Sequence, residues 1–428
     1  MSPTFGIALS LLAASAAAQQ IGQVTPEVHP KLPTQYCTKE GCETRETTVV
    51  LDAQYRWTHT VGGEVDCKLA SGALDPELCP DVETCAETCA VEGADYESYG
   101  IITEGDALTL KLYTSSPRVY LLDANEEEYV DFKLLNREFT YDVDASLLPC
   151  GVNGALYFSE MAADGDKSEL NKAGAAYGTG YCDAQCPKNT WVAGEANIDS
   201  KYGACCNEMD IWEANSLVTA YTPHPCNATE TRACSGAECE EVCDSPGCDF
   251  NAYRMGQQDF YGPNKTVDST KPITVVTQFY TEDNKDDGAL LSIERLYVQN
   301  GKVIENIHVN VDGFPEEYNY LDDEYCDIEA DVFNSGDGYV FAKLGGMTEM
   351  GNALGRGMVL AMSIWSADNG GMLWLDGNTG DVSLPGNLRG PCTADQEQAE
   401  YIEENYPDAA VVFSNIKWGE IGTTFSES

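Results

Sequence analysis

The chain has 428 residues, of which 71 are acidic and 24 are basic, so its formal net charge at pH 7 is −47. This charge makes nucleic acid and anionic membranes poor partners, whereas a neutral polymer would not be repelled. Hydrophobic residues form 43% of the chain, an ordinary share for a protein with a sizeable core. The length allows one large all-β domain or two or three smaller ones.

Residues 1–18 have the pattern of a secretory signal peptide. Residues 5–18 are apolar or small, and Ala16-Ala17-Ala18 fits the small-residue rule for cleavage. The segment contains no Lys or Arg, so its positive charge comes from the amino terminus alone. The apolar run is too short for a membrane anchor. We therefore expect a secreted protein whose mature chain begins at Gln19.

The 18 cysteines all lie beyond residue 18, and an even number in a secreted chain predicts nine disulfides. The pairing cannot be deduced from the sequence. Three pairs have a spacing that metal ligands also use: Cys85/Cys89, Cys182/Cys186 and Cys239/Cys243. With only 4 histidines and an export signal, disulfides are strongly favoured over a metal site. We predict neither a metal nor a cofactor.

Short segments rich in Val, Leu and aromatic residues predict many strands, separated by Gly, Asn and Asp turns. In chain order, strands are expected at 48–57, 107–113, 118–123, 128–135, 138–144, 155–161, 272–281, 293–298, 303–311, 358–365, 372–376 and 410–418. Helices are few and are expected after Pro80 and at about 321–333, 345–356 and 394–405. Asn300-Gly301 between two strands is typical of a hairpin. This pattern favours an all-β sandwich or barrel, and the absence of a repeat or a Pro/Ser/Thr linker favours one domain over 19–428.

Residues 205–215 contain three carboxylates among apolar residues. In a strand, Glu208 and Asp210 share one face while Met209 and Ile211 share the other. Glu213 has the wrong parity for the first face, but one extra residue inserted as a β-bulge would return it there. Three crowded carboxylates cannot all ionise freely, so one raised pKa would give a general acid and one low pKa a nucleophile. That pair suits glycosidic bond cleavage, although a solvated acidic edge strand is the alternative.

The same stretch, Glu-Met-Asp-Ile-Trp-Glu-Ala-Asn after Cys205-Cys206, resembles the catalytic signature of glycoside hydrolase family 7, the fungal retaining cellulases. Further matches run from 25–31 to 413–416. The resemblance implies a concanavalin A-like jelly-roll sandwich with long loops, and a cleft for β-1,4-glucan. It also implies that Glu208 is the nucleophile, Glu213 the acid/base, and Asp210 a supporting carboxylate hydrogen-bonded to the nucleophile. His224, in Thr-Pro-His-Pro-Cys, matches a supporting histidine of the family, and Gln19 would cyclise to pyroglutamate.

The family binds sugar rings on aromatic platforms with polar groups at their edges. Trp57, Trp365 and Trp374 match platform positions, and Tyr55 stands where exo-acting members have Trp. The resemblance also suggests polar substrate contacts at Arg118, Asn153, Tyr157, Asp183, Gln185, Arg254 and Arg389.

The resemblance extends to the loops, whose lengths predict whether the enzyme cuts inside a glucan chain or from its end. The segment 187–204 is short, only four residues separate Cys243 from Cys248, and 350–358 resembles the endo-acting members, while an intermediate loop remains at 377–389. We expect an open cleft with partial cover, no separate cellulose-binding module, and a monomeric endo-β-1,4-glucanase. An exo-acting cellobiohydrolase and a non-catalytic, lectin-like glucan-binding protein are the alternatives.

Two asparagines, Asn227 and Asn264, lie in glycosylation sequons, so we expect them to be candidate glycan sites.

Overall fold

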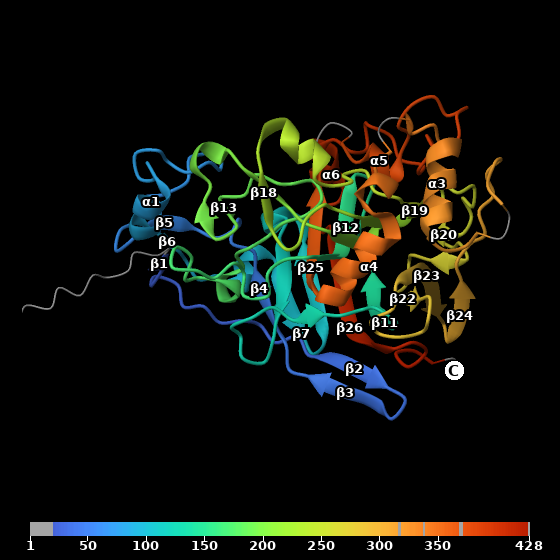
Figure 1. Ribbon diagram of the computed structural model, residues 1–428, viewed down its shortest axis with the longest axis horizontal. Coiled ribbons are helices and arrows are strands. Elements are labelled where there is room, and N and C mark those ends of the chain that lie inside the picture. The colour runs from blue at the N-terminus through green and yellow to red at the C-terminus, as the bar shows by residue number, and fades with distance from the viewer. Residues whose placement is uncertain (1–19, 316–317, 337–338, 368–370, 427–428) are drawn as a thin grey trace, which may run out of the picture.

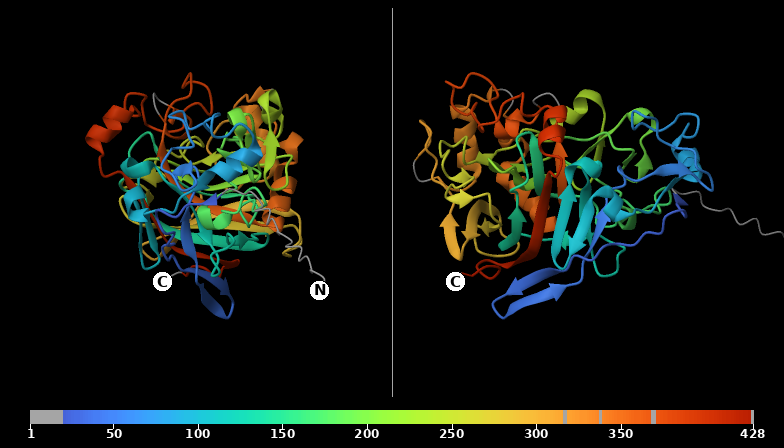
Figure 2. Two further views of the ribbon diagram at one scale, coloured as in Figure 1. Left: turned by 90° about the vertical axis from the view of Figure 1, so that its left-hand side faces the viewer. Right: turned by 180° about the vertical axis from the view of Figure 1, so that it is seen from behind.

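The computed structural model describes residues 20–315, 318–336, 339–367 and 371–426. The predicted signal peptide and Gln19 lie outside these ranges. Within them, strands form two large sheets, and loops and helices gather on the side opposite the projecting hairpin β2–β3 (Figures 1 and 2). The all-β sandwich expected from the sequence is confirmed.

The first sheet carries the 205–215 stretch near its middle. In spatial order it contains β19 (Phe250–Asn251), β17 (Thr219–His224), β16 (Glu208–Ala214), β12 (Val152–Ser159), β25 (Met358–Ser366), β9 (Arg118–Leu122) and β4 (Thr48–Leu51), with β10 (Asp131–Phe132) paired to β25. The β16 strand is therefore paired on both edges, so the alternative of a solvated edge strand is wrong.

The second sheet covers the inner face of the first. Its order is β24 (Lys302–Glu305), β23 (Leu290–Gln299), β22 (Ile273–Thr281), β11 (Arg137–Asp144), β26 (Ala410–Glu420), β2 (Thr34–Thr38) and β3 (Gly41–Arg45), with β8 (Ala107–Lys111) pairing β26 and β7 (Ile101–Glu104). Aromatic side chains join the two sheets: Phe139 meets Phe158 at 4.9 Å, and Tyr141 meets Trp212 at 6.4 Å, between ring centroids. Burial of these rings and of the aliphatic side chains around them stabilises the sandwich.

Smaller elements cover the ends of the sandwich. The helices are α1 (Val82–Thr88), α2 (Leu112–Ser115), α3 (Asp323–Val332), α4 (Gly346–Arg356), α5 (Leu373–Asp376) and α6 (Ala399–Asn405). The remaining short strands are β1 (Gln20–Ile21), β5 (Thr58–Thr60), β6 (Cys89–Val91), β13 (Trp191–Val192), β14 (Glu195–Ala196), β15 (Gly203–Cys205), β18 (Arg232–Cys234), β20 (Tyr261–Gly262) and β21 (Val267–Asp268). No helix in the described ranges is long and apolar enough to cross a membrane.

Several predicted elements differ in extent or type. The 372–376 segment was expected to be a strand but forms the helical turn α5. The strand expected over 48–57 ends at Leu51 because the Asp52 side chain accepts the Gln54 N–H and turns the chain. The strands expected over 128–135 and 303–311 shrink to β10 and β24. The hairpin itself is confirmed, since Asn300 and Gly301 both have positive φ, 54° and 72°.

The prediction of nine disulfides is confirmed, and the three closely spaced cysteine pairs bond to other partners rather than to each other. The bonds are Cys37–Cys42, Cys67–Cys89, Cys79–Cys85, Cys150–Cys392, Cys182–Cys206, Cys186–Cys205, Cys226–Cys243, Cys234–Cys239 and Cys248–Cys326. Four of them tie the segments on either side of β16 and β17, which fixes the loops beside these two strands.

Candidate active site

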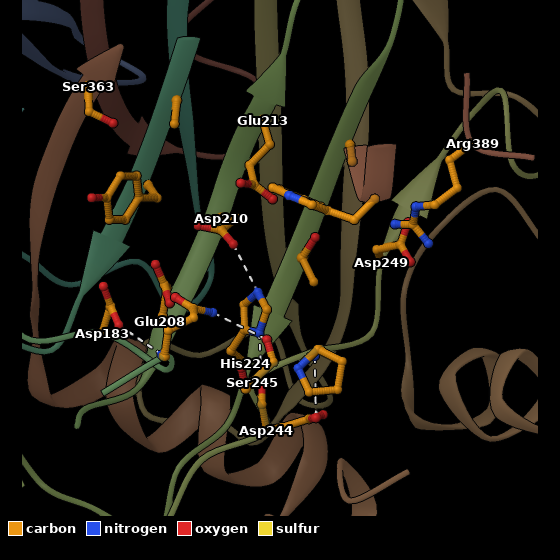
Figure 3. A pocket seen from close by; sticks show the side chains of 18 of the residues that line it. Asp183, Glu208, Asp210, Glu213, His224, Asp244, Ser245, Asp249, Ser363 and Arg389 are labelled. Carbon is orange, nitrogen blue, oxygen red and sulfur yellow. Dashed lines mark hydrogen bonds and ion pairs between the residues drawn. The ribbon is translucent and has the colours of Figure 1, made fainter. Parts of the chain in front are cut away.

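A β-bulge in β16 turns all three carboxylates of the stretch to one side. Opposite β12, Asp210 pairs with Tyr157 and Trp212 pairs with Leu156, so Ile211 is an extra residue in β16. Ile211 and Trp212 consequently both pack in the core between the sheets. Glu213 is returned to the face of Glu208 and Asp210, as the parity argument predicted (Figure 3).

That face forms the floor of a cleft of about 960 Å³. Figure 3 shows the three carboxylates of β16 beside His224 of β17, with Asp183 and Arg389 toward opposite ends. Of the residues predicted from the sequence, those lining the cleft are Tyr55, Arg118, Tyr157, Asp183, Gln185, Glu208, Asp210, Glu213, His224, Arg254, Trp365, Trp374 and Arg389.

Two predicted residues lie elsewhere. Trp57 is outside this cavity, where its indole N–H donates to Asp66 and its ring stacks on His59 at 3.9 Å between centroids. Asn153 lies beneath Glu213 and donates from Nδ2 to Glu213 Oε1 at 2.9 Å. Its Oδ1 accepts the N–H of Ala214 at 3.0 Å. Asn153 is therefore placed to position Glu213 rather than to touch a sugar.

Glu208 is buried at the cleft floor. Its Oε2 accepts the backbone N–H of Ala184 at 2.9 Å. Burial raises its pKa well above the ordinary carboxyl value, the neighbouring charges of Asp210 and Asp183 raise it further, and His224 opposes them. A low pKa is expected for a carboxylate nucleophile, and the structure shows the opposite direction for Glu208. The structure differs because a single backbone N–H and one nearby cation do not compensate for full burial beside two other carboxyls.

Glu213 has the properties of a general acid. Burial, followed by the charge of Asp210, raises its pKa to about 8, while His224 and the hydrogen bond from Asn153 act in the opposite direction. A carboxyl with this pKa remains protonated at acidic and neutral pH, where it can donate a proton to a leaving oxygen.

His224 is the cation of this cluster. Its Nε2 lies 2.9 Å from Asp210 Oδ2, and its Nδ1 lies 2.8 Å from the carbonyl oxygen of Asp244. Burial alone would lower its pKa, but the hydrogen bond and charge of Asp210, together with Glu208, raise it to about 10. The expected hydrogen bond from Asp210 to the nucleophile is thus replaced by one to His224, and Asp210 acts on Glu208 through its charge.

The ligand atoms of Glu208, Asp210 and His224 are close enough together to hold a metal ion. Both nitrogens of His224 face acceptors, however, so both carry protons and neither has a free lone pair for a metal. The chemistry of this donor set therefore fits proton transfer better than metal binding.

One end of the cleft is lined by tyrosines and Arg118. The guanidinium of Arg118 lies over the Tyr181 ring, 3.2 Å from its centroid, and pairs with the buried Asp52 at 2.6 Å. Tyr181 donates to Asp183 at 2.6 Å. Sequence reasoning missed Tyr181 because no motif marks it, although its position two residues before Asp183 puts both on one side of an extended segment.

The other end carries a second charge cluster and two stacked indoles. Asp249 accepts bonds from Arg254 and, at 2.8 Å, from Arg389. Trp365 of β25 and Trp374 of α5 stack with centroids 6.3 Å apart and planes 23° apart. Sequence reasoning missed Asp249, whose sole local signal is its position beside Cys248. Flat aromatic faces flanked by hydrogen-bonding groups suit a sugar ring.

The comparisons with known proteins agree with this geometry. The model of the family described as glycosyl hydrolase family 7 matches residues 21–425. The chain belongs to glycosyl hydrolase family 7. A relative from Aspergillus clavatus named "Probable endo-beta-1,4-glucanase celB" is 54% identical, and the match covers 100% of this chain and 99% of the relative.

Two solved family 7 structures show how closely the fold is shared. A cellobiohydrolase from Daphnia pulex is 42% identical with a TM-score of 0.90, covering 95% of this chain and 100% of that one. The endocellulase EGI from Humicola insolens is 43% identical with a TM-score of 0.86 and the same coverage. The backbone is thus common to exo- and endo-acting members, and the overall fold does not separate these two modes of family 7 action.

Proposed function

We propose that this family 7 enzyme is an endo-β-1,4-glucanase that cleaves internal bonds of cellulose and related β-glucans with retention of configuration. The observation that carries the proposal is the bulge in β16, which places the buried pair Glu208 and Glu213 in one cleft. A lectin-like binding protein would need the aromatic platforms but not this carboxyl pair.

In the first step, ionised Glu208 attacks the anomeric carbon while protonated Glu213 gives its proton to the departing glycosidic oxygen. A covalent glycosyl-enzyme ester forms, and the glycosidic bond breaks. In the second step, Glu213, now ionised, removes a proton from water. The water oxygen attacks the anomeric carbon and releases Glu208, so two inversions give net retention.

The surrounding residues supply charge and orientation for these steps. The Ala184 N–H and the imidazolium of His224 favour the ionised form of Glu208. Asn153 fixes the orientation of Glu213 through its 2.9 Å hydrogen bond. Tyr55, Trp365 and Trp374 are proposed to carry sugar rings along the cleft, with Arg118, Arg254 and Arg389 at hydroxyl groups.

Internal cutting is favoured over exo action by the loops and by the relatives. The loop 244–247 has four residues and is held down by His224 and by Gln185, which donates to Ser245 O at 3.2 Å. The Aspergillus clavatus relative carries an endoglucanase name.

The same proposal covers the processing and state of the protein. It includes secretion after removal of residues 1–18, a single catalytic domain over 19–428, a monomeric state, and glycans on the exposed Asn227 and Asn264.

The deciding experiment compares viscosity loss with reducing-end release on soluble carboxymethylcellulose at pH about 5, where Glu213 is protonated. A steep fall in viscosity with few new ends supports internal cutting. Slow viscosity loss with steady release of cellobiose means exo action, and no release from any β-1,4-glucan supports the lectin-like alternative.

The matched control is Glu208→Gln, which keeps the shape of the side chain and removes the attacking charge. It should bind cello-oligosaccharides while losing hydrolysis, and substantial residual turnover would refute the nucleophile assignment. Proton NMR of a fresh digest tests the stereochemistry, because a retaining enzyme releases the β-anomer first.

A further inference from the structure

The platform residue Trp374 stands on α5, a helical segment of four residues. An isolated turn of this length has no stability of its own in water, so other contacts must hold it in place. Trp374 is 36% exposed and lies against Trp365 on the cleft wall. Any group that fixes α5 therefore fixes the orientation of an indole face offered to substrate.

Two fully buried carboxyls hold opposite ends of α5. At its start, Glu397 Oε2 accepts the backbone N–H of Met372 at 2.9 Å. At its end, Asp376 Oδ2 accepts the Gly151 N–H at 2.9 Å and the Asn215 side-chain amide at 2.6 Å. Asn215 follows β16 directly, so these bonds join α5 to the end of the catalytic strand.

The second oxygens of the two carboxyls have no such donors. Asp376 Oδ1 and Glu397 Oε1 are buried and face no N–H or O–H donor among the described residues. Besides burial, it is Glu397 that raises the pKa of Asp376, so the two carboxyls lie within reach of a hydrogen bond with each other. An ionised carboxyl can only accept, so this bond requires a proton on one of the two. Two ionised carboxyls in buried contact would repel strongly.

The surroundings do not neutralise the pair in another way. The disulfide Cys150–Cys392 lies beside Asp376, and no Lys, Arg or His in the described ranges forms a salt bridge with either carboxyl. Burial and the bond with Glu397 raise the pKa of Asp376 to about 8, against the opposing bonds from Gly151 and Asn215. The Asp376 carboxyl therefore keeps its proton through the acidic and neutral range.

We propose that Asp376 and Glu397 share one proton and act as a positioning pair that holds Trp374 in the cleft wall. As far as sugar binding is concerned, this inference rests on the proposed glucanase function. While the proton is present, the pair ties both ends of α5 together. When it is lost on the alkaline side, repulsion between the two carboxylates separates these ends, and Trp374 no longer stacks on Trp365.

The test follows the stacked indoles by circular dichroism, because two coupled Trp rings give an exciton signal that depends on their geometry. All variants carry Glu213→Gln, which removes the cleft carboxyl that titrates in the same range. Trp374→Phe identifies the part of the signal that belongs to the pair. In Glu397→Gln, the amide donates to Asp376 without a shared proton, and in Asp376→Asn the amide donates to Glu397.

With the native pair, the exciton signal should fall by at least half between about pH 6 and 9, with a midpoint near pH 8, as the shared proton is lost. In Glu397→Gln and Asp376→Asn it should stay constant over that range. Loss of the signal at the same midpoint in both amide variants, or no change with the native pair, would overturn the proposal. Because this readout needs no substrate, its outcome is independent of the glucanase assignment.

A second readout measures binding of cellopentaose by calorimetry in the same inactive background. With the native pair, the dissociation constant should rise by about tenfold over the pH range, the equivalent of one lost stacking contact. The two amide variants should show a change of less than about twofold. If the exciton signal behaves as expected but the variants bind no cello-oligosaccharide at any pH, the positioning role stands and the proposed function fails.

Discussion

His224 donates a hydrogen bond to Asp210 across 2.9 Å while its other ring nitrogen faces the Asp244 carbonyl oxygen, so the imidazole is held as a cation. This cation lies among carboxyls whose burial raises their pKa values. It lowers the pKa of both Glu208 and Glu213 relative to what burial alone would give. His224 therefore favours the ionised form of both carboxyls and lowers the pH at which Glu208 can act as a nucleophile.

Replacing His224 by Gln should move the whole pH profile of kcat/KM to higher pH. Without the cation, the pKa of Glu208 rises, and each unit lowers its ionised fraction at acidic pH about tenfold. The pKa of Glu213 rises as well, so the alkaline limb moves in the same direction. The control is His29→Gln, which alters a buried histidine paired with Glu27 and Glu126, away from the cleft. A profile that falls in height without moving would contradict this role.

Glu213→Gln should reveal the general acid through its dependence on the leaving group. Hydrolysis of carboxymethylcellulose should fall by about 10²–10⁴-fold, the usual contribution of a positioned proton donor. An aryl cellobioside with a 2,4-dinitrophenyl leaving group needs no such proton, so its bond cleavage should fall much less. In the unmodified enzyme, activity on the polymer should decline as the pH rises through about 8, where Glu213 loses its proton. Equal losses on both substrates would rule Glu213 out as the acid.

Asn153→Ala should shift the alkaline limb without abolishing substrate binding. Asn153 lowers the pKa of Glu213 by donating to it, so removing the donor raises that pKa and moves the limb to higher pH. The rate should also fall, because Glu213 loses the contact that fixes its rotamer. Asn171→Ala is the matched control, since Asn171 is equally buried and bonds to Gly165 and Thr179 instead. If both variants merely lower the melting temperature, the positioning role of Asn153 is refuted.

The catalytic strand was predictable because side-chain parity is a local property. Alternation fixes the faces of Glu208 and Asp210, and the offset of Glu213 demands one inserted residue, which the structure supplies at Ile211. Disulfide formation was predictable from cysteine number and compartment, although which cysteines pair depends on how the loops cross in space.

The segment that carries Trp374 was not predictable in the same way. Met-Leu-Trp-Leu is apolar and short, and a run of this length fits a strand or a turn of helix equally well. The choice is made by distant groups, namely Glu397, Gly151 and Asn215, which bond to its two ends. Asn153 illustrates the same limit, because its role depends on a neighbour sixty residues away on β16.

The N-terminal segment offers a test of stability away from the cleft. Glu27 forms two hydrogen bonds with Arg56, at 2.6 and 3.0 Å, and a third with the Tyr96 hydroxyl. The Arg56 side chain is completely buried. Glu27→Gln leaves this buried cation without its counter-charge, so we expect a loss of about 3–5 kcal/mol in the free energy of unfolding. Glu43→Gln, in an exposed pair with Arg45, should change it by less than about 1 kcal/mol.

The same pair predicts how the melting temperature depends on pH. Burial alone would raise the pKa of Glu27, but its bonds with His29, Arg56 and Tyr96 outweigh burial and lower the pKa to about 2. A lowered folded-state pKa gives stability that is present above the unfolded value, near 4.5, and is lost as the pH falls toward 2. The melting temperatures of the unmodified enzyme and Glu27→Gln should therefore differ most above about pH 5 and converge toward pH 2. A difference that stays constant down to pH 2 would mean that Glu27 titrates normally and that its bonds to Arg56 contribute no charge-dependent stability.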